Sequence, residues 1–147
     1  MSFSAMITIS FSKTKFNAHS IYTLIQSGWQ TQIRDQKLIS YLPLGDDGEY
    51  NWRYEDSDKW TTISSIIDKK LQLNEITGII LTFEGTQCDF VLYPKDNKMI
   101  VGINNLGRKK LSNCSNITDY SWYLNRIICP LTGEMSDIVG IKCDDFL

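Results

Sequence analysis

A spacing of glycines that could bind phosphate lies between Gly102 and Lys110. The stretch reads Gly-Ile-Asn-Asn-Leu-Gly-Arg-Lys-Lys, and its two glycines have the separation found in a P-loop. A P-loop also needs Lys and then Ser or Thr directly after the second glycine, because these side chains reach phosphate and magnesium. Arg108 and Lys109 occupy those two positions. We therefore interpret the stretch as a basic turn after a strand, and its three adjacent cations as a solvated loop that does not bind nucleic acid.

The other residue types that could support catalysis also lack a partner at a useful spacing. His19 could act as a general base near neutral pH, but a lone histidine beside a helix start is more often structural or exposed. The neighbouring acids Asp46–Asp47 and Asp144–Asp145 could do acid–base work, yet solvation explains them better. The chain contains no nucleophile elbow, metalloprotease helix or dinucleotide fingerprint. We predict that the protein is not an enzyme and has no catalytic residue.

The cysteines do not predict a metal site. Cys88, Cys114, Cys129 and Cys143 show no C-x-x-C spacing, and one histidine cannot complete a ligand set with them. We expect free, mostly buried thiols, no metal and no cofactor.

Residues 45–60, which we call the acidic aromatic segment, are the most unusual part of the chain. Six acids stand there against two basic residues, so the segment has a formal charge of −4, whereas the whole chain has −2. Four of its residues are aromatic. Carboxylates attract Lys and Arg of a partner, and exposed rings anchor an interface and bind cations. The segment therefore predicts a surface for a basic protein.

The residues predicted to bind this partner are Asp46, Asp47, Glu49, Tyr50, Trp52, Glu55, Asp56 and Asp58. This prediction requires that the turn at Asp46–Gly48 and the start of the helix after Ser57 lie together on the surface. The alternative is that Tyr50, Trp52 and Tyr54 face the core and that the acids are simply solvated.

Composition excludes several classes of protein. The chain has 147 residues, of which 42% are hydrophobic and 22% charged, as is usual for one globular domain. Its net charge of −2 argues against a dedicated nucleic-acid-binding protein. The first ten residues alternate apolar side chains with hydroxyls, which is a strand pattern and not a signal peptide. No apolar run approaches the roughly 20 residues of a membrane span, so we expect a cytoplasmic location.

Hydrophobic periodicity predicts the elements. The predicted strands are 6–12, 37–44, 50–55, three strands between Thr77 and Asn104, and a short strand over 136–143. The predicted helices are 16–27, 58–73 and 118–128. An Asp-Gly turn at residues 46–48 would join the second and third strands as a tight hairpin, which would place Tyr50, Trp52 and Tyr54 on one strand face. The apolar stripe of the second helix would contain Ile63 and Ile67, with Lys70 off the stripe.

This order of elements predicts an α+β fold for residues 1–147 as a single domain. We expect an antiparallel sheet of about five to seven strands, which can be strongly bent, with two or three helices packed on one side.

The overall profile resembles bacterial immunity proteins, including those of contact-dependent growth inhibition, which neutralise toxins delivered by neighbouring cells. The resemblance rests on small size, an α+β pattern, mild acidity, many aromatic residues and the lack of catalytic motifs. It implies a non-enzymatic inhibitor that binds a cognate toxin. Many such toxins are nucleases with basic substrate-facing surfaces, which the acidic aromatic segment would cover. The resemblance assigns no role to a single residue.

Two alternatives remain open at the level of sequence. One is a small ligand-binding domain or enzyme with an unrecognised pocket, which a convergent pocket with a perturbed titratable residue would favour. The other is an adaptor or regulatory protein of another system, which would bind a protein in the same way. The oligomeric state cannot be read from the sequence.

Overall fold

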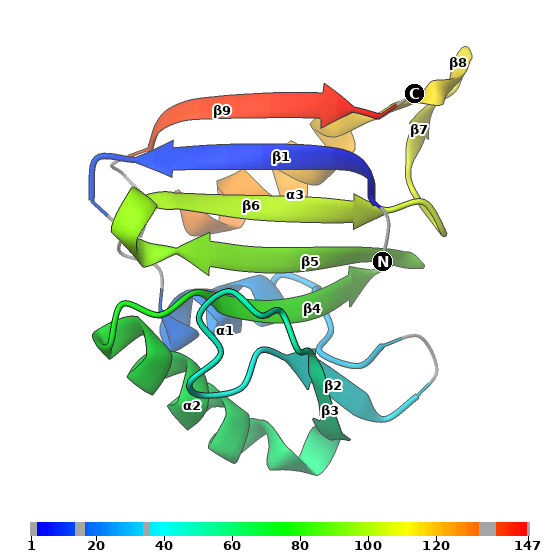
Figure 1. Cartoon of the computed structure of the whole chain (residues 1–147). Helices are drawn as coiled ribbons and strands as arrows, with labels where there is room; N and C mark the ends of the chain where they lie inside the picture. The colour runs from blue at the N-terminus through cyan, green and yellow to red at the C-terminus, as the bar shows by residue number, and fades with distance from the viewer. Residues whose placement is uncertain (1–2, 14–16, 34–35, 133–137, 147) are drawn as a thin grey trace.

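An antiparallel sheet of seven strands organises the molecule, in the order β3-β2-β4-β5-β6-β1-β9 (Figure 1). The computed structural model describes residues 3–13, 17–33, 36–132 and 138–146. The sheet strands are β1 Phe3–Phe11, β2 Leu38–Tyr41, β3 Arg53–Asp56, β4 Thr77–Phe83, β5 Thr86–Tyr93, β6 Lys98–Asn104 and β9 Ile138–Asp145. The remaining elements are a small hairpin of β7 Lys110–Leu111 and β8 Cys114–Thr118, the helices α1 Ala18–Gln26, α2 Trp60–Gln72 and α3 Tyr120–Leu131, and the 3-10 turns η1 Ser57–Lys59 and η2 Pro94–Asp96. The predicted α+β class is confirmed.

The centre of the sheet follows the predicted pattern. Strands β4, β5 and β6 form the expected antiparallel meander. Strand β1 lies between β6 and β9 and pairs with both. The alternation of β1 buries Ala5, Ile7 and Ile9 completely. The last strand spans 138–145, and residues 136–137 of its predicted range lie outside the described residues.

Two of the three described helices lie on one face of this sheet, and the third lies along its lower side. Figure 1 shows α1 and α3 behind the sheet and α2 below it. Asn17 caps α1 by accepting the Ser20 N–H at 3.1 Å, whereas residue 16 of the predicted helix lies outside the described residues. The core between helices and sheet contains the fully buried Trp29. Its indole packs edge-on against the rings of Phe83 and Phe90, with distances between ring centroids of 5.3 and 5.2 Å. None of the described helices has the length and apolar character needed to cross a membrane.

Two of the three basic residues after β6, Arg108 and Lys109, are docked and not solvated as predicted, whereas Lys110 is exposed. The Arg108 side chain is 8% exposed, lies 3.6 Å from the Asp145 carboxylate and donates to the Thr118 hydroxyl at 2.7 Å. Lys109 lies over the Trp122 ring and donates to the Glu84 carbonyl at 2.8 Å. Asp145 therefore fastens the end of β9 to the small hairpin, which is a structural role and not simply solvation.

The thiols are free, as expected, but most are not buried. Cys88 is buried and Cys143 is half-buried, whereas Cys114 and Cys129 are exposed. The two exposed thiols lie in the small hairpin and in α3, away from the centre of the sheet.

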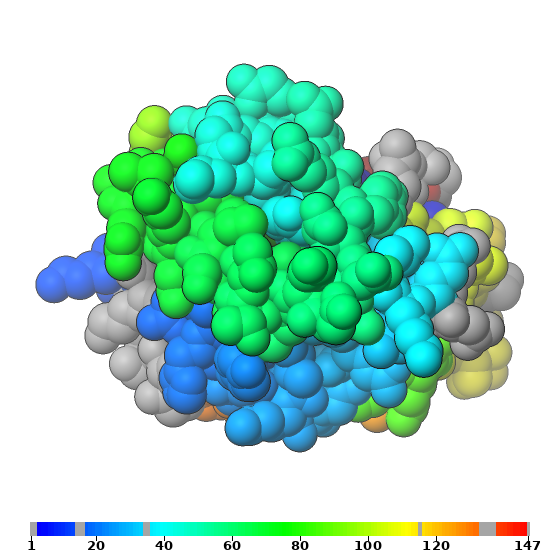
Figure 2. Space-filling model, turned by 90° about the horizontal axis from the view of Figure 1, so that it is seen from below, coloured from blue at the N-terminus to red at the C-terminus, as the bar shows by residue number. Residues whose placement is uncertain are grey.

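The predicted tight hairpin between the second and third strands is wrong. Strand β2 ends at Tyr41 and β3 begins at Arg53, so residues 42–52 form a long loop, which we call the crossing loop. Figure 1 shows this loop in front of β4, on the sheet face opposite to α1 and α3. Figure 2 shows the loop and β3 from below, beside α2 and α1. Tyr50, predicted within a strand, has a left-handed φ of 57° instead.

A buried lysine holds the crossing loop. Lys70 was predicted to lie off the apolar stripe of α2, but its side chain is fully buried. The reason is its position three residues after Ile67 and seven after Ile63, which places it on the same helix face. Its ammonium group donates to the carbonyls of Pro43 and Asp46, both at 2.7 Å, and to Glu75 Oε1 at 3.1 Å.

Replacing Lys70 with Met should therefore destabilise the protein strongly. Met retains most of the apolar stem but leaves one buried carbonyl, one half-buried carbonyl and a half-buried carboxylate without their donor. Breaking such a pair costs about 3 kcal/mol or more. Urea denaturation measures the change in the free energy of unfolding. Lys69→Met on the exposed face of α2 is the matched control and should change it by less than about 0.5 kcal/mol. Equal effects of the two substitutions would mean that Lys70 does not hold the loop.

Candidate functional site

Asp46 fixes the shape of the crossing loop from within. Its carboxylate accepts the backbone N–H groups of Glu49 and Tyr50 at 3.0 Å and of Asn51 at 2.7 Å. Burial alone would raise the pKa of Asp46, but these N–H donors outweigh it, and the pKa lies below its ordinary value. Asp46 was predicted to bind a partner. At 7% exposure, with its oxygens occupied inside the loop, it is a structural residue.

The other predicted acids fall into two groups. Asp47 and Glu49 are exposed on the crossing loop, where Asp47 accepts the Ile76 N–H at 2.8 Å and Glu49 accepts the Asp47 N–H at 3.0 Å. Asp56 and Asp58 are exposed at the end of β3 and in η1, before α2 begins. Glu55 is half-buried and pairs with Ile39 of β2, on the opposite side of β3 from Tyr54 and Asp56.

These two groups of acids lie at opposite ends of α2. The loop contacts Lys70 near the end of the helix, whereas Asp58 precedes its first residue, Trp60. Ten residues of helix separate these points by about 15 Å. The expectation that the turn and the helix start lie together does not hold, and the acidic aromatic segment is not one continuous surface.

The predicted aromatic residues Tyr50 and Trp52 lie on the open face of the sheet, by which we mean the face turned away from the helices. Trp52 packs on Gly78 of β4, where a Cβ atom would come within 2.8 Å of the indole ring. The Tyr50 hydroxyl bonds the Tyr93 hydroxyl at 2.9 Å. The third ring of the segment, that of Tyr54, is exposed. None of the three is part of the core between helices and sheet, contrary to the alternative that the sequence left open.

Tyr50, Trp52 and Tyr93 border a cavity of about 460 Å³, which we call the open-face cavity. Strand β5 contributes alternate residues to it, because Cys88, Phe90 and Leu92 face the core. The cavity is of the size that small ligands occupy. Its lining residues are Phe3, Met6, Tyr50, Trp52, Asp89, Val91, Tyr93, Ile100 and Gly102.

Asp89 is the one carboxylate among these lining residues. It is 1% exposed, and its Oδ1 atom has no hydrogen-bond partner among the described residues. Its cross-strand neighbours are Ile80 and Gly102, neither of which can donate a hydrogen bond from a side chain. The Phe3 ring covers Gly102, where a Cβ atom would lie 2.5 Å from the ring. Burial among these apolar groups raises the pKa of Asp89 to about 7.

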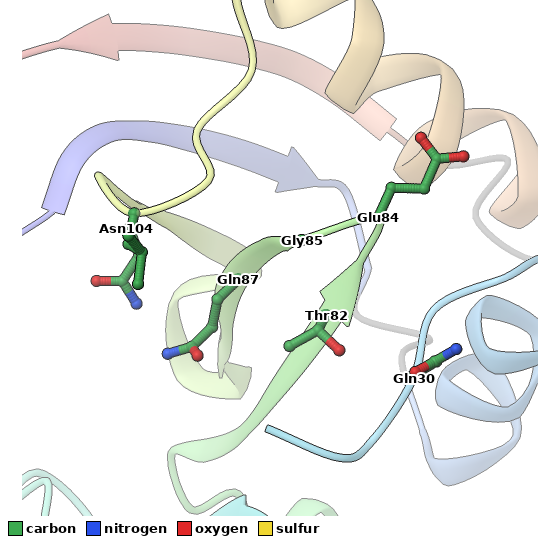
Figure 3. A pocket seen from close by; sticks show the side chains of 7 residues that line it. Gln30, Thr82, Glu84, Gly85, Gln87 and Asn104 are labelled. Atoms are coloured by element: carbon green, nitrogen blue, oxygen red, sulfur yellow. The ribbon is translucent and has the colours of Figure 1, made fainter. Parts of the chain in front are cut away.

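A second cavity of about 490 Å³ lies near one end of β4, β5 and β6 (Figure 3). Amide and hydroxyl side chains of Gln30, Thr82, Gln87 and Asn104 line it. Glu84 is its one charged lining residue, and Figure 3 shows that this side chain points away from Gln87 and Asn104. The groups there do not converge on a point, so the open-face cavity is the better candidate site.

Of the nine described residues that line the open-face cavity, the sequence predicted two, and Asp89 and Tyr93 are the polar ones that it missed. Tyr50 and Trp52 were predicted, whereas Asp89 and Tyr93 were not. Asp89 had a signal, because it is the one acid in the apolar run Cys-Asp-Phe-Val-Leu, a position where a carboxylate is costly to bury. Tyr93 had none, since a tyrosine at the end of a strand is common.

Comparisons of the chain with protein-family models, with curated proteins and with solved structures gave no match. Within the described parts of the chain, no three His, Cys, Asp or Glu side chains group in a way that could hold a metal ion.

Asp89 should make the stability of the protein fall as pH rises from 5 to 8. In the unfolded chain this carboxyl ionises near pH 4, whereas in the folded protein it keeps its proton up to about pH 7. The folded state thus binds one more proton between these values, and the free energy of unfolding should drop by about 3 kcal/mol between pH 5 and pH 8. Urea denaturation across this range measures the drop.

The Asp89→Asn variant should lack this drop, because an amide has no proton to lose in the range. Asp144→Asn, on the same face but in β9, is the matched control and should keep the dependence of the parent protein. A parent stability that stays level between pH 5 and pH 8, or an equal drop in the Asp89→Asn variant, would contradict the assignment.

Proposed function

We propose that the protein is a non-enzymatic inhibitor that binds a basic protein on the open face of its sheet. The proposal rests on the residues that line and border the open-face cavity. The crossing loop carries exposed acids and places the rings of Tyr50 and Trp52 against a cavity whose one carboxylate, Asp89, has no cation beside it among the lining residues. Rings and carboxylates around a hollow are suited to bind a cationic partner.

The charge around the mouth supports a basic partner. Asp47, Glu49 and Asp96, the exposed acids of what we call the mouth, lie beside the open-face cavity and do not line it. Asp47 and Asp96 line an adjoining cavity of about 230 Å³ that shares Tyr93 with it, and Glu49 precedes Tyr50 in the crossing loop. Lys95 offsets part of this charge, because it lies 3.6 Å from Asp47. Including Asp89 and Lys98, which lies over the Tyr93 ring, four carboxyl groups face two ammonium groups. A negative mouth of this kind raises the rate at which a positive partner associates.

The partner that we propose is a bacterial toxin, and specifically a nuclease. This part rests on the resemblance to toxin-immunity proteins and on the fit between an acidic mouth and the basic surface with which a nuclease binds its substrate. A standard interface buries about 800 Å² on each partner. The crossing loop, η2 and the open strand faces beside them can supply such an area, whereas Asp56 and Asp58 lie outside it.

A small-ligand-binding protein or an enzyme is the second candidate, and Asp89 is the observation that favours it. A carboxyl group with a pKa of about 7 suits a general acid or base. Catalysis also needs a second group, and no Ser, Cys, His or Lys is among the described residues that line the cavity. The phenol of Tyr93 is a poor proton donor there, because burial and then its bond to Tyr50 raise its pKa. Binding therefore fits the cavity better than turnover.

Reversing charge at the mouth should slow association with the partner. The variant Glu49→Lys with Asp96→Lys changes the mouth, and Asp56→Lys with Asp58→Lys makes the same change in charge at the other end of α2. The immobilised protein is used to capture its partner from extracts of the native cells and of their competitors, and association rates are then measured at low and high salt.

The mouth variant should associate at least tenfold more slowly at low salt, with the difference shrinking at high salt because salt screens exposed charges. The control variant should associate like the parent. The parent should abolish the nuclease activity of the captured protein at a one-to-one ratio. Equal rates for both variants would refute the mouth as the binding site, and complete inhibition at far below one equivalent would point to an enzyme.

A further inference from the structure

The open-face cavity has the features of a receptor for one alkylammonium group. The acceptor is Asp89, whose Oδ1 atom is buried and unpartnered among the described residues. A buried polar atom without a partner is unfavourable unless a ligand or solvent can satisfy it. Asp89 lines the cavity, so the donor that satisfies it can come from a bound group.

The walls of the cavity suit the stem of such a group. Met6, Val91 and Ile100 provide apolar surface against which methylene groups can pack. The rings of Tyr50 and Trp52 border the cavity and can stabilise a cation in a partly desolvated place.

Other ligand classes fit less well. An anion would meet the Asp89 carboxylate and no cation among the lining residues. A purely apolar ligand would cover the carboxyl group and leave it unsatisfied, which is costly. A guanidinium group pairs best with both oxygens of a carboxylate, whereas Asp89 presents one buried, unpartnered oxygen among the described residues.

We propose that the open-face cavity binds a primary alkylammonium group, which in the complex described above is a lysine side chain of the basic partner. The identity of the partner rests on the proposed function, whereas the chemistry of the cavity does not. The lysine stem would lie along the apolar wall, and its ammonium group would donate to Asp89 beneath Trp52.

The probe for this test is n-butylammonium, which reproduces the lysine side chain, with 1-butanol as the neutral compound of the same size. Both are titrated into the labelled protein, and amide and indole N–H signals are followed by nuclear magnetic resonance. The ammonium probe should shift the signals of Gly102, Val91 and the Trp52 indole in a saturable way. It should bind at least tenfold more tightly than 1-butanol at pH 8.

Two further measurements tie the binding to Asp89. Asp89→Asn should weaken n-butylammonium binding at least tenfold and leave 1-butanol binding unchanged, while the control Asp144→Asn should alter neither. Binding should also strengthen as pH rises from 6 to 8, because the cation binds the ionised carboxylate. The other described titratable or charged groups on or beside this face are Asp47, Glu49, Tyr50, Tyr93, Lys95, Asp96, Lys98, Lys142 and Asp144. The charge of the N-terminal amino group also acts on Asp89 and lowers its pKa.

Equal binding of n-butylammonium and 1-butanol to the parent protein would overturn the proposal, and this comparison needs no variant. Tighter binding of n-propylguanidinium than of n-butylammonium would also overturn it, in favour of an arginine side chain. Because these probes are used without the partner, their failure is distinct from failure of the inhibitor function. Probe binding without partner capture would leave the cavity assignment supported and the inhibitor function refuted.

Discussion

The buried ammonium group of Lys70 is the interaction on which the candidate site depends. It comes from α2, below the sheet, and joins two carbonyls of the crossing loop and the carboxylate of Glu75. A charge in such a place is favourable only when several acceptors surround it, so the helix and the loop determine each other's positions. Asp46 then fixes the remainder of the loop through three backbone N–H groups. The hydrogen bonds of Lys70 and Asp46 together position the crossing loop so that Tyr50 and Trp52 lie on the open face.

Two glycines on the open face, Gly78 and Gly102, determine where the aromatic rings around the cavity lie. Gly78 of β4 leaves room for the Trp52 indole, and Gly102 of β6 leaves room for the Phe3 ring. Asp89 lies beside Gly102 and has no side-chain donor opposite it. The same absence of side chains thus makes room for two rings that border the cavity and leaves the carboxyl group of Asp89 without a donor opposite it. Filling either glycine would require the aromatic neighbour to move, so the geometry of the cavity is tied to its rings.

The sequence predicted those parts of the fold that depend on local periodicity. The alternation of β1, the apolar positions Ile63 and Ile67 of α2, and the meander of β4 to β6 needed no distant information. The Asp-Gly pair at residues 47–48 favoured a tight hairpin. A long loop forms instead, because the Asp46 carboxylate accepts three backbone N–H groups of that loop. The spacing of Lys70 from Ile63 and Ile67 indicated the buried face of α2, but a lysine is rarely buried, so its burial was not predicted. The sequence could not predict that the Asp89 carboxyl group lacks a hydrogen-bond partner. This property depends on Gly102 in the neighbouring strand and on the Phe3 ring that covers Gly102.

The short strand β3 lies at the edge of the sheet, and the acids that it carries protect this edge. The sheet is not closed, and among the described strands none lies on the outer side of β3, which leaves one row of its backbone N–H and C=O groups without a strand beside it. Arg53, Glu55 and Asp56 place charge along that four-residue border. Charged and short borders resist the addition of a strand from another molecule, which is the first step of aggregation between sheets. One half of the acidic aromatic segment thus lies beside the open-face cavity, and the other half protects the edge of the sheet.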